Sequence, residues 1–182
     1  MYPNIHEIIH GRQWSTFCKH PQAASMRIVR EFYANAKEHT NRSTFVQGKF
    51  VPFNTDAIDP YFDIPKAVID EYNEYIIMEP NFNKVINYFF KSNKQWKMSK
   101  RLPLSFKNSQ LYGAYKCCLY FIATRLLLMK HVTNITKDIA LLLYYILTGK
   151  AINIGKLIYI TILFFANTPH EDIWFPSLIT DL

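Results

Sequence analysis

Two apolar runs in the last third of the chain constrain its fold most strongly. They cover residues 139–147 and 157–166, nine and ten residues long, and the polar residues Thr148, Lys150 and Lys156 lie between them. A helix that spans a bilayer needs about 20 apolar residues. We therefore interpret both runs as helices buried in a protein core, and we expect no membrane segment.

The three cysteines indicate a reducing compartment. Cys18, Cys117 and Cys118 are an odd set with two adjacent members, which does not suit a disulfide framework. Residues 1–10 mix polar side chains with isoleucines and do not resemble a secretion signal. We expect an intracellular protein, in the cytoplasm or the nucleus, that is not secreted.

Apolar residues recur at helical spacing along most of the remaining chain. In the segment 82–90 they occupy positions i, i+3, i+4, i+7 and i+8, which is the pattern of one buried helix face. Five glycines among 182 residues are few for an all-β fold, and the 16% aromatic residues can fill a large core. The prediction is a mainly α, single-domain helical bundle over residues 1–182, built around helices at 109–130, 136–148 and 153–166. Thr136 with Asp138 predicts the start of the second of these helices, and Gly149 its end.

One segment breaks the helical pattern. Residues 44–53 carry β-branched and aromatic side chains on both sides of Gln47 and Gly48, which predicts a small β-hairpin. It is the only strand pair that we expect, and it must lie against helices because an isolated hairpin is marginally stable. The apolar end at 175–182 leads us to expect that the chain is a piece of a longer protein.

Charge is divided unevenly along the sequence. Residues 52–79 hold seven acids and one base, whereas residues 80–137 hold eleven bases and no acid. Lysines spaced along a surface can follow a phosphate backbone, and an indole among them can stack on an unpaired base. The candidate nucleic-acid site consists of Lys91, Lys94, Trp96, Lys97, Lys100, Arg101 and Lys107. The alternative, which we favour, is that the acidic and basic blocks neutralise each other in the fold.

No catalytic or metal-binding set is evident. Asp56, Asp59 and Asp63 have helix-like spacing, but Pro60 interrupts them and no strand supports a two-metal carboxylate site. His6 and His10 are four residues apart, as on one helix face, with Cys18 and His20 nearby, but no second cluster has the spacing of zinc ligands, and we interpret them as surface histidines. Residues 149–156 do not have the order of a phosphate-binding loop and are expected to form a turn between two core helices. We expect a protein that is not an enzyme and that uses no cofactor, metal or small-molecule substrate.

Several stretches resemble the putative plant transposon protein domain family, a group of retroelement-derived plant proteins. The resemblance is carried by the stretches at 29–35, 137–156 and 175–180. Between them, 45–53, Trp96-Lys97 and 124–127 lie in the expected order. The resemblance implies a transposon-derived origin and brings no catalytic residues. Our leading hypothesis is a non-enzymatic structural or interaction module that associates with itself or with another protein. The alternative is a domain that binds DNA or RNA through the basic region 84–137.

Overall fold

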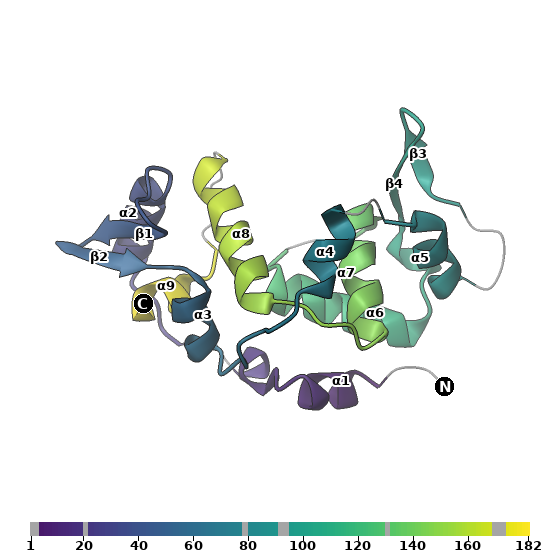
Figure 1. Cartoon of the computed structure of the whole chain (residues 1–182), viewed down its shortest axis with the longest axis horizontal. Coiled ribbons are helices and arrows are strands. Elements are labelled where there is room, and N and C mark those ends of the chain that lie inside the picture. Colours follow the sequence, from purple (N-terminus) through teal and green to yellow (C-terminus); the bar gives the residue numbers. More distant parts are fainter. Residues whose placement is uncertain (1–3, 20–21, 78–79, 91–94, 130–131, 169–173) are drawn as a thin grey trace. The chain divides into compact units, whose positions relative to one another are not determined.

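The computed structural model of the chain is predominantly helical, with two small antiparallel sheets, which confirms the mainly α prediction (Figure 1). The structure describes residues 4–19, 22–77, 80–90, 95–129, 132–168 and 174–182. No helix in these described ranges is long and apolar enough to cross a membrane. The α-helices are α1 (Ile5–Gly11), α2 (Met26–Ala36), α3 (Thr55–Tyr61), α4 (Glu71–Ile77), α5 (Phe82–Phe89), α6 (Gly113–Phe121), α7 (Lys137–Leu147), α8 (Ile154–Asn167) and α9 (Pro176–Asp181).

The chain divides into two compact units. Unit 1 consists of Met1–Arg12 and Ala67–Asn153, and unit 2 consists of Gln13–Lys66 and Ile154–Leu182. Of the helices expected to form one bundle, 109–130, 136–148 and 153–166, α6 and α7 belong to unit 1 and α8 belongs to unit 2, so the expectation that the three share one core stays a prediction. The expectation of a single domain over residues 1–182 stays a prediction.

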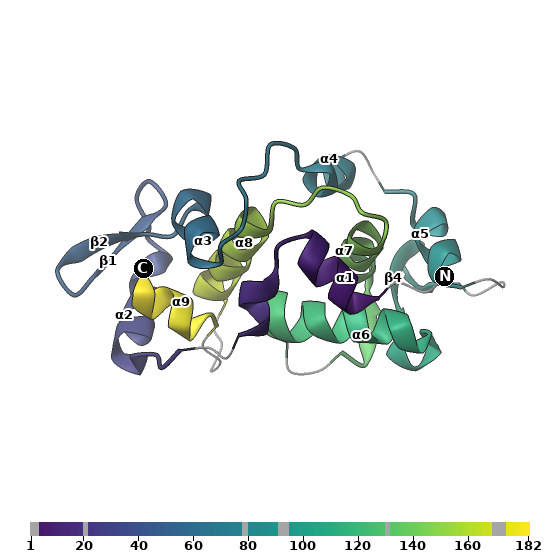
Figure 2. The ribbon, with the colours of Figure 1, turned by 90° about the horizontal axis from the view of Figure 1, so that it is seen from below.

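Helix α7 forms the centre of unit 1. Its residues from Ile139 to Leu143 are all buried, and the hydroxyl of Thr136 accepts a hydrogen bond from the Ile139 amide at 3.5 Å. Gly149 follows the helix with φ of +73°, a left-handed conformation that glycine adopts without strain. The predicted start and end of this helix are confirmed. Helix α5 packs against α7, and α1 lies along α6 (Figure 2).

Unit 1 also contains a three-stranded antiparallel sheet that the sequence did not lead us to expect. Its strands are β3 (Lys97–Ser99), β4 (Leu102–Lys107) and β5 (Asn134–Thr136), in the order β3-β4-β5. The register pairs Phe106 with Ile135, and both side chains are buried. A bulge between Lys97 and Met98 interrupts the pairing of β3 with β4.

The long helix expected at 109–130 is shorter in the structure. A 3₁₀ turn at Asn108–Gln110 precedes α6, and a π-helical turn at Ile122–Leu126 follows it. Leu128 then adopts φ of +47°, which ends the helical path. The sequence-based boundary was wrong because apolar residues stand on both sides of the change of helix type, at 117–121 and at 122, 123 and 126.

Unit 2 is built around α2 and α8. Helix α2 buries Val29, Phe32 and Ala36, and it packs against α8, α9 and the hairpin, while α3 packs on α8 (Figures 1 and 2). The predicted hairpin is confirmed as β1 (Ser43–Val46) paired with β2 (Lys49–Pro52). The turn residues Gln47 and Gly48 both have positive φ, as a two-residue hairpin turn requires.

Candidate functional site

All of the net charge of the chain lies in unit 1. Unit 1 holds thirteen of the 21 Lys and Arg residues and six of the 14 Asp and Glu residues, which gives it a formal charge of +7. Unit 2 holds eight bases and eight acids and is formally neutral. The net charge therefore attracts an anionic partner to unit 1 and not to unit 2.

The β3–β4 hairpin carries the densest basic surface that the structure describes. Lys97, Lys100, Arg101 and Lys107 are all exposed on it. We call these four residues the basic hairpin surface. The hairpin extends away from α5 within unit 1 (Figure 1). Two further members of the sequence-predicted site, Lys91 and Lys94, lie outside the described residues.

Lys100 and Arg101 form the tip of this hairpin. Their φ angles are +49° and +68°, so the two residues make a turn in which both adopt the left-handed conformation. The side chains of Met98, Leu102 and Leu104 behind the tip are exposed as well. The hairpin thus presents two cations at its end and a partly apolar stem.

The structure corrects the role that we expected for Trp96. Its side chain is only 6% exposed, and its Nε1 donates a hydrogen bond to the carbonyl of Phe82 at 3.0 Å. The rings of Phe82 and Phe106 lie edge-on to the indole, with centroid distances of 5.8 and 5.2 Å. The indole therefore serves the core of unit 1, and the expectation that it stacks on an unpaired base is wrong for this fold.

In the described part of the chain, two acids of residues 52–79 form ion pairs with lysines that are not part of the basic hairpin surface. Asp56 Oδ1 lies 2.8 Å from Lys66 Nζ, and Glu71 Oε1 lies 2.8 Å from Lys150 Nζ, so both acids bind bases outside residues 80–137. The hydrogen bond from Lys150 and that from the Ala151 amide hold the pKa of Glu71 below its ordinary value. Within the described part of the chain, no ion pair involves a residue of the basic hairpin surface.

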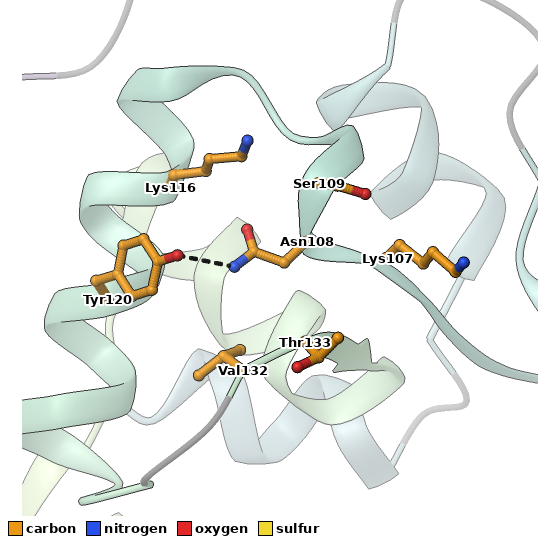
Figure 3. A pocket seen from close by; sticks show the side chains of 7 residues that line it. All are labelled: Lys107, Asn108, Ser109, Lys116, Tyr120, Val132 and Thr133. Carbon is orange, nitrogen blue, oxygen red and sulfur yellow. Dashed lines mark hydrogen bonds between the residues drawn. The ribbon is translucent and has the colours of Figure 1, made fainter.

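An open pocket lies where the basic hairpin surface meets α6. Its volume is about 460 Å³, and it lies within unit 1. No acid lines it among the described residues. The lining side chains come from the end of β4, the 3₁₀ turn, α6 and the segment before β5 (Figure 3), namely Lys107, Asn108, Ser109, Lys116, Tyr120, Val132 and Thr133.

Asn108 is the buried polar residue of this pocket. Its side chain is 9% exposed, and its Nδ2 donates to the hydroxyl of Tyr120 at 3.3 Å, as Figure 3 shows. Its Oδ1 accepts no hydrogen bond within the described part of the protein. Sequence reasoning counted Lys107 and Lys116 among the bases but missed Asn108 and Tyr120, since only the 3₁₀ turn after β4 brings that amide to α6.

The acids considered for a nuclease site have different surroundings in the structure. Asp56 pairs with Lys66, while Asp59 is buried, and burial followed by repulsion from Asp56 raises the pKa of Asp59. The described residues contain no group of three His, Cys, Asp or Glu side chains that can hold a metal. His20, one of the histidines considered for zinc, lies outside those residues.

The turn between α7 and α8 binds protein carboxylates through its backbone. The Ala151 amide donates to Glu71 Oε2 at 2.7 Å, and the Asn153 amide donates to Asp70 Oδ1 at 3.3 Å. A phosphate loop needs such amides directed at its ligand. Because two of them are already engaged, the segment serves as a connection, as the sequence predicted.

Comparison with known proteins and protein families identifies the family of this chain. No curated protein matches this chain, and no solved structure does. Residues 10–182, nearly the whole chain, match the family described as a putative plant retrotransposon-related domain. The stretches that carried the resemblance in the sequence all lie within this range. The chain belongs to the plant retrotransposon-related domain family.

Proposed function

We propose that unit 1 binds nucleic acid through the basic hairpin surface. The observation that carries the proposal is that Lys97, Lys100, Arg101 and Lys107 are exposed and have no acid paired with them in the described part of the chain. Had the acids of unit 1 neutralised the hairpin, we would expect Glu71 near it. Instead, Glu71 binds Lys150.

The shape of the hairpin suits a nucleic-acid groove or backbone. The major groove of B-DNA admits a two-stranded β-ribbon, and the tip residues Lys100 and Arg101 are placed to reach phosphates. No aromatic ring of the hairpin offers a stacking face now that Trp96 is known to be buried. We therefore propose that this surface contacts phosphates with little sequence preference.

The test is the salt dependence of binding to labelled duplex DNA and single-stranded RNA. A variant with Lys97, Lys100, Arg101 and Lys107 changed to Gln removes the surface. Each lost phosphate contact lowers the slope of log K against log salt by about 0.9 on duplex DNA and about 0.7 on a single strand. We expect the variant to bind more weakly on every sequence, with a slope that is flatter by up to about 3.6 on duplex DNA and up to about 2.8 on a single strand.

A matched control removes the same charge from unit 2. Lys19, Arg30, Lys37 and Lys49 are exposed there, and their change to Gln gives the same net charge as the hairpin variant. The proposal requires this control to keep the wild-type slope. Equal losses in both variants would reduce the effect to total charge, and unchanged binding by the hairpin variant would remove the surface from consideration.

A second candidate function, self-association, is favoured by the hairpin of unit 2. Phe45 and Phe50 are cross-strand partners whose rings meet edge-to-face at 5.3 Å, yet they remain 48% and 69% exposed. Strand β2 is exposed along most of its length, and unit 2 is formally neutral, so two copies do not repel each other there. An exposed strand with aromatic side chains is a surface on which another strand can pair.

This candidate predicts a dimer that depends on the aromatic pair. Sedimentation over a range of concentrations would show association of the wild-type chain and a monomer after Phe45→Ser and Phe50→Ser. A variant with Met98→Ser and Leu102→Ser removes exposed apolar residues from unit 1 instead and serves as the control. A wild-type chain that stays monomeric at high concentration would end this candidate.

A further inference from the structure

Asn108 presents an unused hydrogen-bond acceptor next to the pocket of unit 1. Its Nδ2 is engaged with Tyr120, whereas Oδ1 has no donor within the described residues. Buried polar groups are almost always paired, so a buried acceptor beside a cavity indicates a missing donor. Figure 3 shows the carboxamide oxygen on the side of the pocket where Lys116 lies. The oxygen itself has almost no accessible surface, so a ligand must displace part of the pocket wall to reach it.

Tyr120 supplies an aromatic face at the same place. Its side chain is 51% exposed, and its hydroxyl accepts the hydrogen bond from Asn108, which fixes the direction of the ring. A half-exposed ring held in this way is a platform for a flat heterocycle, since every nucleobase has a face that stacks on aromatic side chains.

The remaining walls of the pocket favour an anion. Lys107 and Lys116 line it together with the hydroxyl groups of Ser109 and Thr133, and no carboxylate lines it among the described residues. Its volume of about 460 Å³ falls in the range of about 300–1,000 Å³ that is usual for small-molecule sites. A phosphodiester group has no N–H or O–H and would leave the Asn108 acceptor without a donor.

We infer that this pocket binds a single nucleotide whose base donates an N–H to Asn108 Oδ1, stacks on Tyr120 and places its phosphate near Lys107 and Lys116. The inference rests on the proposed function, because it names one subsite at the root of the basic hairpin surface. The hairpin contacts backbone without regard to sequence, and the pocket selects a base.

The first measurement compares two ligands that differ in one amino group. Adenosine 5′-monophosphate carries the exocyclic N–H, and purine riboside 5′-monophosphate lacks every N–H on the base. Calorimetry and amide chemical shifts of the whole chain should show AMP binding about tenfold tighter, with shifts at Asn108 and along α6, because an unmet buried acceptor costs about one decade in affinity. Equal affinity, or no binding of AMP at millimolar concentration, would overturn the inference. Inorganic phosphate that shifts the same amides as strongly as AMP would overturn it as well.

Variants assign the preference to the two side chains. Asn108→Asp keeps an acceptor and should keep the AMP preference, whereas Asn108→Leu should abolish it. Tyr120→Phe keeps the ring and should bind AMP, whereas Tyr120→Leu should not. Unfolding curves show that each variant is folded. A preference that survives Asn108→Leu in a folded chain would place the discriminating group elsewhere and contradict the inference.

Two further measurements distinguish a free nucleotide from a nucleotide within a strand. They also distinguish failure of this inference from failure of the proposed function. A triple variant, Lys97→Gln with Lys100→Gln and Arg101→Gln, leaves the pocket intact and should keep AMP binding while it loses affinity for oligo(A). If AMP binds and no oligonucleotide does, the ligand is a free nucleotide and the hairpin proposal fails alone. If the wild-type chain binds oligonucleotides with the salt dependence that the hairpin proposal requires, but shows no preference for bases that carry an N–H, the pocket inference fails alone.

Discussion

Gly155 and Asp59 approach each other so closely that no side chain fits at position 155. A Cβ built on Gly155 would lie 1.9 Å from Oδ1 of Asp59. Gly155 is in the first turn of α8, and Asp59 comes from α3, so the contact sets the separation of these two helices in unit 2. Asp59 is 7% exposed, and its Oδ1 accepts no hydrogen bond among the described residues.

We predict that Gly155→Ala destabilises unit 2. The added methyl group forces the carboxylate or the helix to move, and overpacking of this kind costs about 1–3 kcal/mol. The gain in helix propensity of Ala over Gly, up to about 1 kcal/mol, offsets only part of that cost. Urea unfolding of both proteins measures the difference.

The control for this substitution is Gly113→Ala, at the first position of α6. Nothing lies within 4 Å of a Cβ at Gly113, so we expect no loss of stability. Adding Asp59→Ala to Gly155→Ala should restore part of the loss, since it removes the atom that the methyl group meets. Additive losses in that double variant would show that the helices are held apart by another contact.

The pH dependence of stability should carry the signature of Asp59. Burial, followed by repulsion from Asp56, raises the pKa of Asp59 in the folded chain above its ordinary value of about 3.9. The folded state therefore binds this proton more tightly than the unfolded state, and the free energy of unfolding falls as pH rises from about 4 through the raised pKa. The loss is complete above that pKa.

Asp59→Asn isolates this effect because the amide does not titrate. We expect the free energy of unfolding of the variant, relative to the wild type, to rise between about pH 4 and the raised pKa and then to level off. Asp56→Asn should act in the opposite direction, since the hydrogen bond from Lys66 lowers the pKa of Asp56. Parallel curves for wild type and Asp59→Asn would contradict the assignment.

Arg12 is predicted to hold the C-terminal end of α7. Its Nη2 donates to the carbonyls of Tyr145, Ile146 and Lys150 at 3.2, 3.1 and 2.9 Å. Hydrogen bonds from a charged donor contribute about 1.5–3 kcal/mol, so Arg12→Met should lower the free energy of unfolding by about that amount. Arg12→Lys keeps the charge but not the planar group, so its free energy of unfolding should lie between those of the wild type and Arg12→Met. An Arg12→Met chain with wild-type stability would show that water replaces the guanidinium without loss.

Substitutions at the tip of the β3–β4 hairpin should raise the stability of the chain and weaken its binding to nucleic acid. Lys100 and Arg101 both have positive φ, a conformation that costs non-glycine residues about 1–2 kcal/mol each. Lys100→Asn with Arg101→Gly matches the two-residue turn, so we expect a gain of about 1 kcal/mol in stability with weaker nucleic-acid binding. Lys100→Gln with Arg101→Gln removes the same charges without the gain. Unweakened binding by both variants would exclude the tip from the contact.

The sequence by itself determined the features that depend on neighbouring residues. The apolar run at 139–147 and the cap at Thr136 gave α7, and Gln47-Gly48 between β-branched and aromatic residues gave the first hairpin. Helical periodicity, capping and turn chemistry act over a few residues, so they can be read from a local segment. The basic character of residues 80–137 was equally plain, because charge is a property of composition.

Only the tertiary structure decided which segments meet. It paired β4 with β5 across about thirty residues, assigned α8 to unit 2, and buried Trp96 against Phe106. It also brought Asn108 to Tyr120 and so formed the pocket. Such contacts depend on which apolar surfaces bury each other at long range, and an apolar residue that faces the core has the same local pattern whichever partner covers it.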